Sequence, residues 1–133
     1  MPMIPQAIIA MLATARLGAI HSLVFGGFAS KELASRINHA KPKIIVSANA
    51  GVEPNRVIDY KQLLDKAVEL SDHKPKNCIY FNRKMFPEAD LSTNRDMNLN
   101  YDKELDSAKK HDCVPVESNH PLFVIKDYFI ISS

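Results

Sequence analysis

Apolar residues in this chain fall into short runs divided by polar residues, and the runs predict alternating helices and strands. The first run predicts a helix from Pro5 to Leu17, which Gly18 ends. Because this helix is apolar on most sides, we expect it to lie buried against a sheet. The run from Ala19 to Phe25 then predicts a short buried strand.

The middle of the chain repeats this alternation. Apolar residues at helical spacing predict a helix from Ser30 to His39, with Ser30 as its N-cap. The run from Lys43 to Ser47 is rich in β-branched residues, which is typical of a strand covered on both faces. The following segment, Asn49 to Arg56, contains glycine and proline and therefore predicts a loop.

The next segments extend the pattern. Asp59 is expected to cap a helix that runs to about Ser71, with Gln62 at the capping-box position. Cys78 to Phe81 then predicts a third strand. Strands that alternate with helices of this length are typical of a parallel sheet. We therefore expect an α/β fold in which helices flank a partial parallel sheet.

The last third of the chain is less regular. Residues 83–98 are polar and predict a surface excursion. A short helix is expected from Tyr101 to Lys110, and the apolar run from Leu122 to Ile131 predicts a strand in one or two pieces. An apolar helix at one end and an apolar strand at the other, each without a covering neighbour, indicate a segment of a larger α/β domain.

Composition and charge narrow the class of protein. The 133 residues are 46% hydrophobic and 24% charged, which is typical of a globular domain. A net charge of +2, without a block of lysine or arginine, does not indicate nucleic-acid binding. The apolar N-terminal segment is interrupted by Arg16 and His21, so we expect neither a membrane span nor a secretion signal.

The cysteines and histidines, which often serve as catalytic groups or metal ligands in proteins, form no recognisable catalytic or metal-binding pattern in this sequence. Cys78 and Cys113 match neither a zinc nor a redox spacing, and we expect both to be free buried thiols in a reducing compartment. The five histidines have no metal-ligand spacing, so no metal site is expected. His21 is expected to be a core histidine with its polar atoms satisfied, and His111 to Cys113 is expected to be a loop.

The segment around Gly26 and Gly27 joins the first predicted strand to the helix that begins at Ser30. Two glycines permit positive φ and bring backbone amides close to a ligand, and ligands of α/β sheets gather at the carboxyl ends of strands. On local pattern alone, an ordinary turn and a ligand cradle both remain open.

A resemblance to a known family rests on collinear segments along most of the chain. They are Met1–Gln6, Met11–Ala13, Ala15–Ser22, Phe25–Phe28, Lys41–Lys43, Gly51–Pro54 with Arg56, His73–Pro75, Arg95–Asp96 and His111–Val116. In these segments the chain resembles the short-chain acyl-CoA synthetases of the AMP-forming (adenylate-forming) superfamily, most of all the mitochondrial, propionate-type members. The resemblance covers residues 1–125 and implies part of the N-terminal domain of such an enzyme. Residues 126–133 form a divergent tail.

The resemblance implies a site for coenzyme A. In the family, the coenzyme A nucleotide packs near the glycine turn and near the loop that follows the next strand. The matching residues of this chain are Phe25, Gly26, Gly27, Glu53, Pro54, Asn55 and Arg56. Arg56 can hold a phosphate by a charge-assisted hydrogen bond, whereas Asn55 departs from the small glycine usual at its position.

ATP and Mg²⁺ belong, by this resemblance, to the parent family only. The family continues beyond Phe123 into a phosphate loop that grips ATP, and this chain diverges from about Lys126. No catalytic residue is expected here, and the chain alone is expected to be inactive.

Two hypotheses about function therefore stand. In the first, the chain is a fragment of a propionate- or acetate-activating acyl-CoA ligase, located in the mitochondrial matrix by resemblance or else in the cytoplasm. In the second, it is a non-catalytic α/β binding or interaction module that pairs through exposed sheet edges, with itself or with a full-length synthetase.

Overall fold

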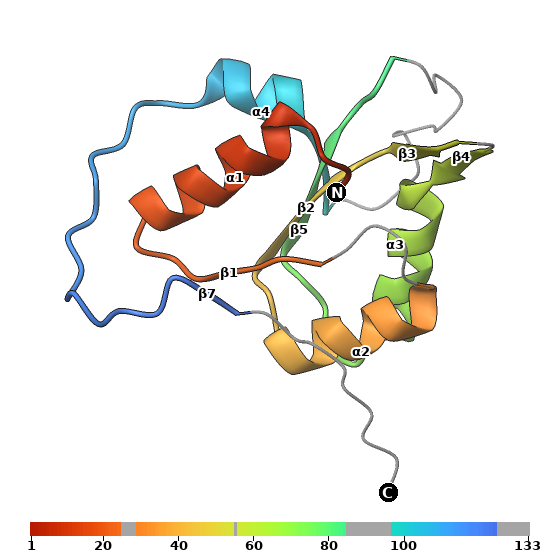
Figure 1. Ribbon diagram of the computed structural model, residues 1–133, viewed down its shortest axis with the longest axis horizontal. Coiled ribbons are helices and arrows are strands. Elements are labelled where there is room, and N and C mark those ends of the chain that lie inside the picture. The colour runs from red at the N-terminus through yellow and green to blue at the C-terminus, as the bar shows by residue number, and fades with distance from the viewer. Residues whose placement is uncertain (25–28, 55, 85–96, 125–133) are drawn as a thin grey trace, which may run out of the picture.

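The computed structural model describes residues 1–24, 29–54, 56–84 and 97–124 (Figure 1). The helices in these ranges are α1 (Pro5–Arg16), α2 (Ser30–Ala40), α3 (Tyr60–Leu70) and α4 (Tyr101–Ser107). The strands are β1 (His21–Ser22), β2 (Ile44–Ala48), β3 (Ala50–Glu53), β4 (Arg56–Asp59), β5 (Asn77–Phe81), β6 (Asn98–Asn100) and β7 (Phe123–Val124). The predicted α/β fold with parallel strands is confirmed.

A three-stranded sheet forms the centre of the better-packed part of the molecule. Its order is β2-β5-β6, and both pairings are parallel. Each β2 residue pairs with one of β5, from Ile44 with Asn77 to Ala48 with Phe81. The predicted crossover between these two strands is confirmed, because α3 lies between them in sequence and packs beside β2.

Helices α2 and α3 pack against each other and cover one face of this sheet. Alternate residues of β5 point toward them, because Cys78 and Tyr80 are buried and their neighbours are half-buried. The shared core consists of Ala34, Ile37, Leu64, Ala67, Val68, Cys78 and Tyr80. We call α2, α3 and the sheet β2-β5-β6 the sandwich.

The other face of the sheet is covered less completely. The ring of Phe81 meets that of Tyr101 at the start of α4, with centroids 5.6 Å apart in an edge-to-face arrangement. At the opposite end of β2, Ile44 is exposed. The expectation that this strand is covered on both faces is therefore wrong at its first residue, because α4 reaches only part of that face.

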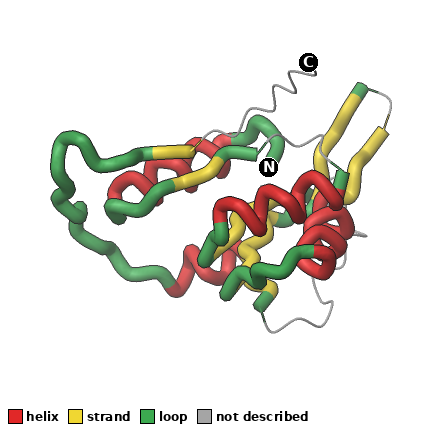
Figure 2. The backbone as a smooth tube through the Cα atoms, turned by 90° about the horizontal axis from the view of Figure 1, so that it is seen from below, coloured by secondary structure: helices red, strands yellow, loops and turns green. Residues whose placement is uncertain are grey.

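The helix α1 and the strands β1 and β7 form a second layer, which we call the open layer. The two strands pair in parallel, His21 with Phe123 and Ser22 with Val124, and the ring centroids of His21 and Phe123 are 5.8 Å apart. Figures 1 and 2 place this layer together on one side of the molecule, away from α2 and α3. It is joined to α4 by the long segment 108–122.

The expectation that the first helix is buried against a sheet is wrong. None of its residues is buried, and Leu12 is 66% exposed. The physical reason is that, among the described residues, β1 and β7 form a sheet of their own instead of extending the central sheet beneath α1. The helix does end as predicted, because Gly18 adopts φ +64° just beyond the C-cap residue Leu17.

Helix ends were predicted with mixed success. Asp59 caps α3 as expected, since its side chain accepts a hydrogen bond from the backbone amide of Gln62 at 2.8 Å. The N-cap of α2 is Ala29, not Ser30 as predicted. Ser30 is the first residue inside the helix, and it is buried. The helix ends at Lys41, whose left-handed φ of 45° stops it before Pro42.

Two expectations about single residues are also corrected. Cys78 is free and buried as predicted, but Cys113 is free and exposed because segment 108–122 runs along the surface. His21 is not satisfied among the described residues, because its buried Nδ1 has no hydrogen-bond partner there. The excursion at 83–98, the end of the last predicted strand and the predicted tail lie largely or wholly outside the described residues.

Candidate functional site

The residues expected to contact coenzyme A are only partly described. Phe25, Gly26, Gly27 and Asn55 lie outside the described residues, and of Glu53 only the backbone is described. Pro54 and Arg56 are described, and both are exposed. The structure therefore gives the surroundings of the second half of the expected site.

Pro54 and Arg56 belong to a β-hairpin where the sequence predicted a loop. Strands β3 and β4 pair antiparallel from Ala50 with Asp59 to Glu53 with Arg56, so Arg56 stands at the hairpin tip. The prediction of a loop is wrong because glycine and proline at positions 51 and 54 were taken as loop signals. Proline is tolerated at a turn between short strands, and glycine at a close approach within one.

The hairpin presents both an apolar and a charged surface to solvent. Val52 and Val57 pair across the two strands and are 55% and 45% exposed. Arg56 lies next to Val57 at the tip and is exposed as well. Because successive side chains of a strand point to opposite faces, Arg56 projects from the face opposite to Val52 and Val57, and the charged and apolar surfaces lie on different faces of the hairpin.

The base of the hairpin needs a glycine. Gly51 is buried against the ring of Tyr60, the first residue of α3. A Cβ atom at Gly51 would lie 2.4 Å from Cζ of Tyr60, which is far closer than a real contact. Any other residue would therefore have to displace the outer end of the Tyr60 ring.

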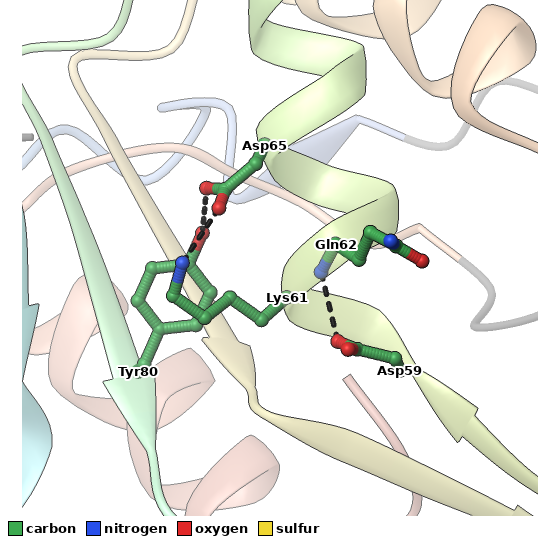
Figure 3. Close-up of polar contacts among 5 residues, drawn as sticks. All are labelled: Asp59, Lys61, Gln62, Asp65 and Tyr80. Atoms are coloured by element: carbon green, nitrogen blue, oxygen red, sulfur yellow. Dashed lines mark hydrogen bonds and ion pairs between the residues drawn. The ribbon is translucent and has the colours of Figure 1, made fainter. Parts of the chain in front are cut away.

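The first turns of α3 are fastened to the sheet by a cluster of polar side chains (Figure 3). Lys61 Nζ lies 2.6 Å from Asp65 Oδ2, and the hydroxyl of Tyr80 on β5 donates to Asp65 Oδ1 at 3.1 Å. The Lys61 side chain is only 5% exposed, and its ammonium lies 5.6 Å from the centre of the Tyr80 ring. Because α3 begins where the hairpin ends, this cluster also fixes the direction in which the hairpin leaves the sheet.

Hydrogen bonds at the edge of the sheet opposite to the hairpin show in which direction α2 and α3 run. The amide of Asn38, near the end of α2, bonds the backbone of Asp72 and His73, just after α3. His73 Nε2 lies 2.8 Å from the carbonyl oxygen of Pro42, shortly before β2 begins. Both helices therefore end at the amino edge of the sheet, and both begin at its carboxyl edge. The start of α2, which follows the glycine turn, and the hairpin belong to the same edge.

Metal binding and membrane insertion have little support among the residues described. In those ranges, no three His, Cys, Asp or Glu side chains gather as metal ligands would. No described helix combines the length and apolar character needed to cross a membrane.

Comparison with known proteins decides the family. The model of a family described as "AMP-binding enzyme" matches residues 1–125. The chain belongs to the AMP-binding enzyme family.

Its relatives within the family are acyl-CoA synthetases. The chain is 53% identical over 125 residues to the rat protein "Acyl-CoA synthetase short-chain family member 3, mitochondrial", covering 94% of this chain and 18% of the relative. It is 52% identical over 125 residues to the human protein of that name, with the same coverage. It is 50% identical over 92 residues to "Propionate--CoA ligase" of Escherichia coli strain K12, covering 69% of this chain and 15% of that one.

A solved structure confirms the fold of this AMP-binding family chain. "Acetoacetyl-CoA Synthetase from Streptomyces lividans" superimposes with a TM-score of 0.73 at 21% identity, over 92% of this chain and 18% of that one. This chain thus spans less than a fifth of the length of these relatives. The predicted resemblance to short-chain acyl-CoA synthetases is confirmed.

Sequence reasoning missed residues that shape this site. Lys61 and Asp65 are spaced i, i+4 on a predicted helix, which was the available signal for their ion pair. Asn49, which is fully buried, was placed in a loop. No local signal could reveal its role, because its side-chain partners lie 33 and 34 positions away in the sequence.

Proposed function

We propose that this chain carries part of the coenzyme A site of an AMP-forming short-chain acyl-CoA ligase that acts on propionate or acetate. In this proposal the nucleotide end of coenzyme A binds at the hairpin tip, at Glu53, Pro54, Asn55 and Arg56, and at the glycine turn, at Phe25, Gly26 and Gly27. The acid, ATP and Mg²⁺ are handled by the whole ligase and are assigned to no residue of this chain.

The observation that carries the proposal is the exposed arginine at the hairpin tip. The guanidinium of Arg56 can donate paired, charge-assisted hydrogen bonds to a phosphate. Two further facts support it. The start of α2 belongs to the same sheet edge, and a helix N-terminus favours anions. Relatives at 53% and 50% identity bear the names of an acyl-CoA synthetase and a propionate–CoA ligase.

The test is a titration of the chain with coenzyme A, followed by heteronuclear NMR. Arg56→Ala should weaken binding about 10- to 100-fold, because a hydrogen bond to a charged group contributes about 1.5–3 kcal/mol. Arg16→Ala is the matched control, since Arg16 is exposed in the last turn of α1, in the open layer. Equal affinity of the two variants, or no saturable binding by the unmodified chain, would contradict the proposal.

A specific observation favours a second candidate function, an interaction module. Large apolar side chains of the open layer are exposed, namely Ile8, Ile9, Leu12, Ile20, Leu23, Leu122, Phe123 and Val124. As far as the chain is described, the sheet formed by β1 and β7 has two strands, so each strand has an outer edge that can pair with another polypeptide. We propose that this layer pairs with a second copy of the chain or with a full-length synthetase.

Light scattering after gel filtration, over a range of concentrations, tests this candidate. The unmodified chain should associate as concentration rises, and Leu12→Lys should shift it toward the monomer. Ile44→Lys serves as the control, because Ile44 is exposed to a similar degree on the sandwich. A chain that stays monomeric at every concentration would exclude self-association, and addition of a full-length synthetase would then test the other partner.

The proposed location follows the relatives. Several of their names place them in mitochondria, and we propose the mitochondrial matrix for the ligase to which this chain corresponds, with the cytoplasm as the alternative.

A further inference from the structure

Asn49 lies between β2 and β3, at the carboxyl edge of the sheet, and is completely buried. Its side-chain Nδ2 donates to Oδ1 of Asn82 at 2.7 Å, and its Oδ1 accepts from the backbone amide of Arg83 at 2.8 Å. Its backbone amide donates to the carbonyl of Phe81 at 3.0 Å. One residue thus joins the end of β2 to the end of β5 and to the segment beyond it.

The same residue also holds both ends of the hairpin. The hairpin enters at Ala50, directly after Asn49, and leaves at Asp59, which pairs with Ala50. The backbone amide of Lys61, in the first turn of α3, donates to the carbonyl of Asn49 at 3.0 Å. Arg83, aligned by Asn49 Oδ1, donates from Nη1 to the carbonyl of Ala50 at 3.3 Å. The hairpin entry therefore depends on the side-chain amide of Asn49 through Arg83, and the hairpin exit is held by the backbone carbonyl of Asn49.

We infer that Asn49 is a positioning residue for ligand binding at the hairpin. It touches no ligand, since it is buried at the hairpin base, and acts through Arg56 at the tip. The inference rests on the proposed coenzyme A site. A ligand gains affinity when the groups that bind it are already held in place, because less conformational freedom is lost on binding. Without the Asn49 amide, the hairpin would still form, but its tip would no longer be fixed relative to the sheet.

The chain offers a matched control at the opposite edge of the same sheet. Asn38 bridges α2 to the segment after α3 with a comparable set of bonds, to Asp72 and to the backbone of His73. It lies at the amino edge, away from the hairpin. A residue that only contributes to stability should behave alike at either edge, whereas a positioning residue should affect binding at one edge only.

The experiment compares Asn49→Ala with Asn38→Ala in the whole chain. Thermal unfolding of each variant and its affinity for coenzyme A are both measured. We expect both variants to unfold at lower temperature, and we expect Asn49→Ala alone to bind coenzyme A at least tenfold more weakly. In the double variant with Arg56→Ala, the loss should not exceed that of Arg56→Ala alone, because Asn49 acts through Arg56. Unchanged affinity in Asn49→Ala, or an equal loss in Asn38→Ala, would overturn the inference.

Amide hydrogen exchange separates failure of the inference from failure of the proposed function. In Asn49→Ala, the amides of β3 and β4 should exchange at least tenfold faster, while those in the middle of α3 keep their rates. This readout needs no ligand, so it decides the positioning role even if the unmodified chain does not bind coenzyme A. Should Asn49→Ala fail to fold, Asn82→Ala takes its place. Asn82 is exposed, and this variant removes the side-chain oxygen that accepts a hydrogen bond from Asn49 Nδ2. It should then give the same pattern with a smaller amplitude, and unchanged exchange in β3 and β4 would overturn the inference.

Discussion

The helix of the open layer is more apolar than the two helices of the sandwich, yet it is covered less. In the sandwich, Ile37, Leu64 and Val68 are buried between two helices and a sheet. In the open layer, Ile8, Leu12 and Phe123 are each more than half exposed. An apolar pattern in the sequence therefore indicates which side chains need to be buried. Whether they are buried depends on how the other helices and strands are arranged around them.

The sandwich also holds its polar groups in closed networks. The ion pair of Lys61 and Asp65 is completed by the hydroxyl of Tyr80, and the amide of Asn49 has partners for both its nitrogen and its oxygen. In the open layer, Nδ1 of His21 is buried, and no hydrogen-bond partner for it lies within the described part of the chain. The networks around Asp65 and Asn49 are expected to make their part of the sandwich more stable and more uniquely arranged.

The largest expected effect comes from opening the polar network of the sandwich. Asp65→Ala should lower the free energy of unfolding by about 3–5 kcal/mol, because it leaves the buried Lys61 ammonium and the Tyr80 hydroxyl without their acceptor. Urea denaturation followed by circular dichroism measures this. Asp72→Ala, which removes a carboxylate from an exposed contact with Asn38, should cost less than about 1 kcal/mol. Similar losses in the two variants would mean that the buried network does not distinguish the sandwich.

A pair of identical substitutions compares the two regions directly. Leu64→Ala in the sandwich should cost about 2–5 kcal/mol, since Leu64 is 3% exposed and the substitution leaves a cavity. Leu12→Ala in the open layer should cost less than about 0.5 kcal/mol, because the side chain is already in water. The same urea titrations provide both values. A large loss in Leu12→Ala would show that another polypeptide, or a second copy, covers α1 in solution.

A smaller effect than those of Asp65→Ala and Leu64→Ala is expected within the open layer, at the end of α1. Gly18→Ala should cost about 1–2 kcal/mol, because φ is +64° and a Cβ atom would lie 3.0 Å from Cγ1 of Val116. Gly18→Asn should cost less, since asparagine tolerates this backbone conformation. The measurement is hydrogen-exchange protection of the α1 amides, which reports local opening of this layer. If alanine and asparagine have equal effects, the contact with Val116 dominates and the backbone conformation does not.

Local features of the fold were predictable from the sequence. Asp59 was identified as a helix cap because the bond from its carboxylate to the Gln62 amide spans three residues. The β-branched run in β2 and the apolar run in β5 were identified as strands because such residues pack well on a pleated surface. Their parallel pairing followed from the helix between them.

What the sequence could not predict depends on partners that are distant along the chain. The hairpin β3–β4 was taken for a loop, because Gly51 reads as a turn signal until Tyr60 is seen to occupy the space beside it. The exposure of α1 and of Cys113 depends on where segment 108–122 runs. Of the candidate site, Arg56 was singled out from its charge and its family resemblance, whereas Asn49 was missed because its bonds close only after β2 and β5 pair.

The parallel pairing of β1 with β7 has a consequence for the order in which the chain folds. His21 meets Phe123 about a hundred positions later, and closing a free loop of that length costs of order 4 kcal/mol in chain entropy. Two residue pairs cannot offset such a cost. Once the sandwich and α4 have formed, however, most of this loop is already closed, and only the segment before α2 and the long segment 108–122 remain to be closed. The β1–β7 sheet should therefore form last during folding and open first during unfolding.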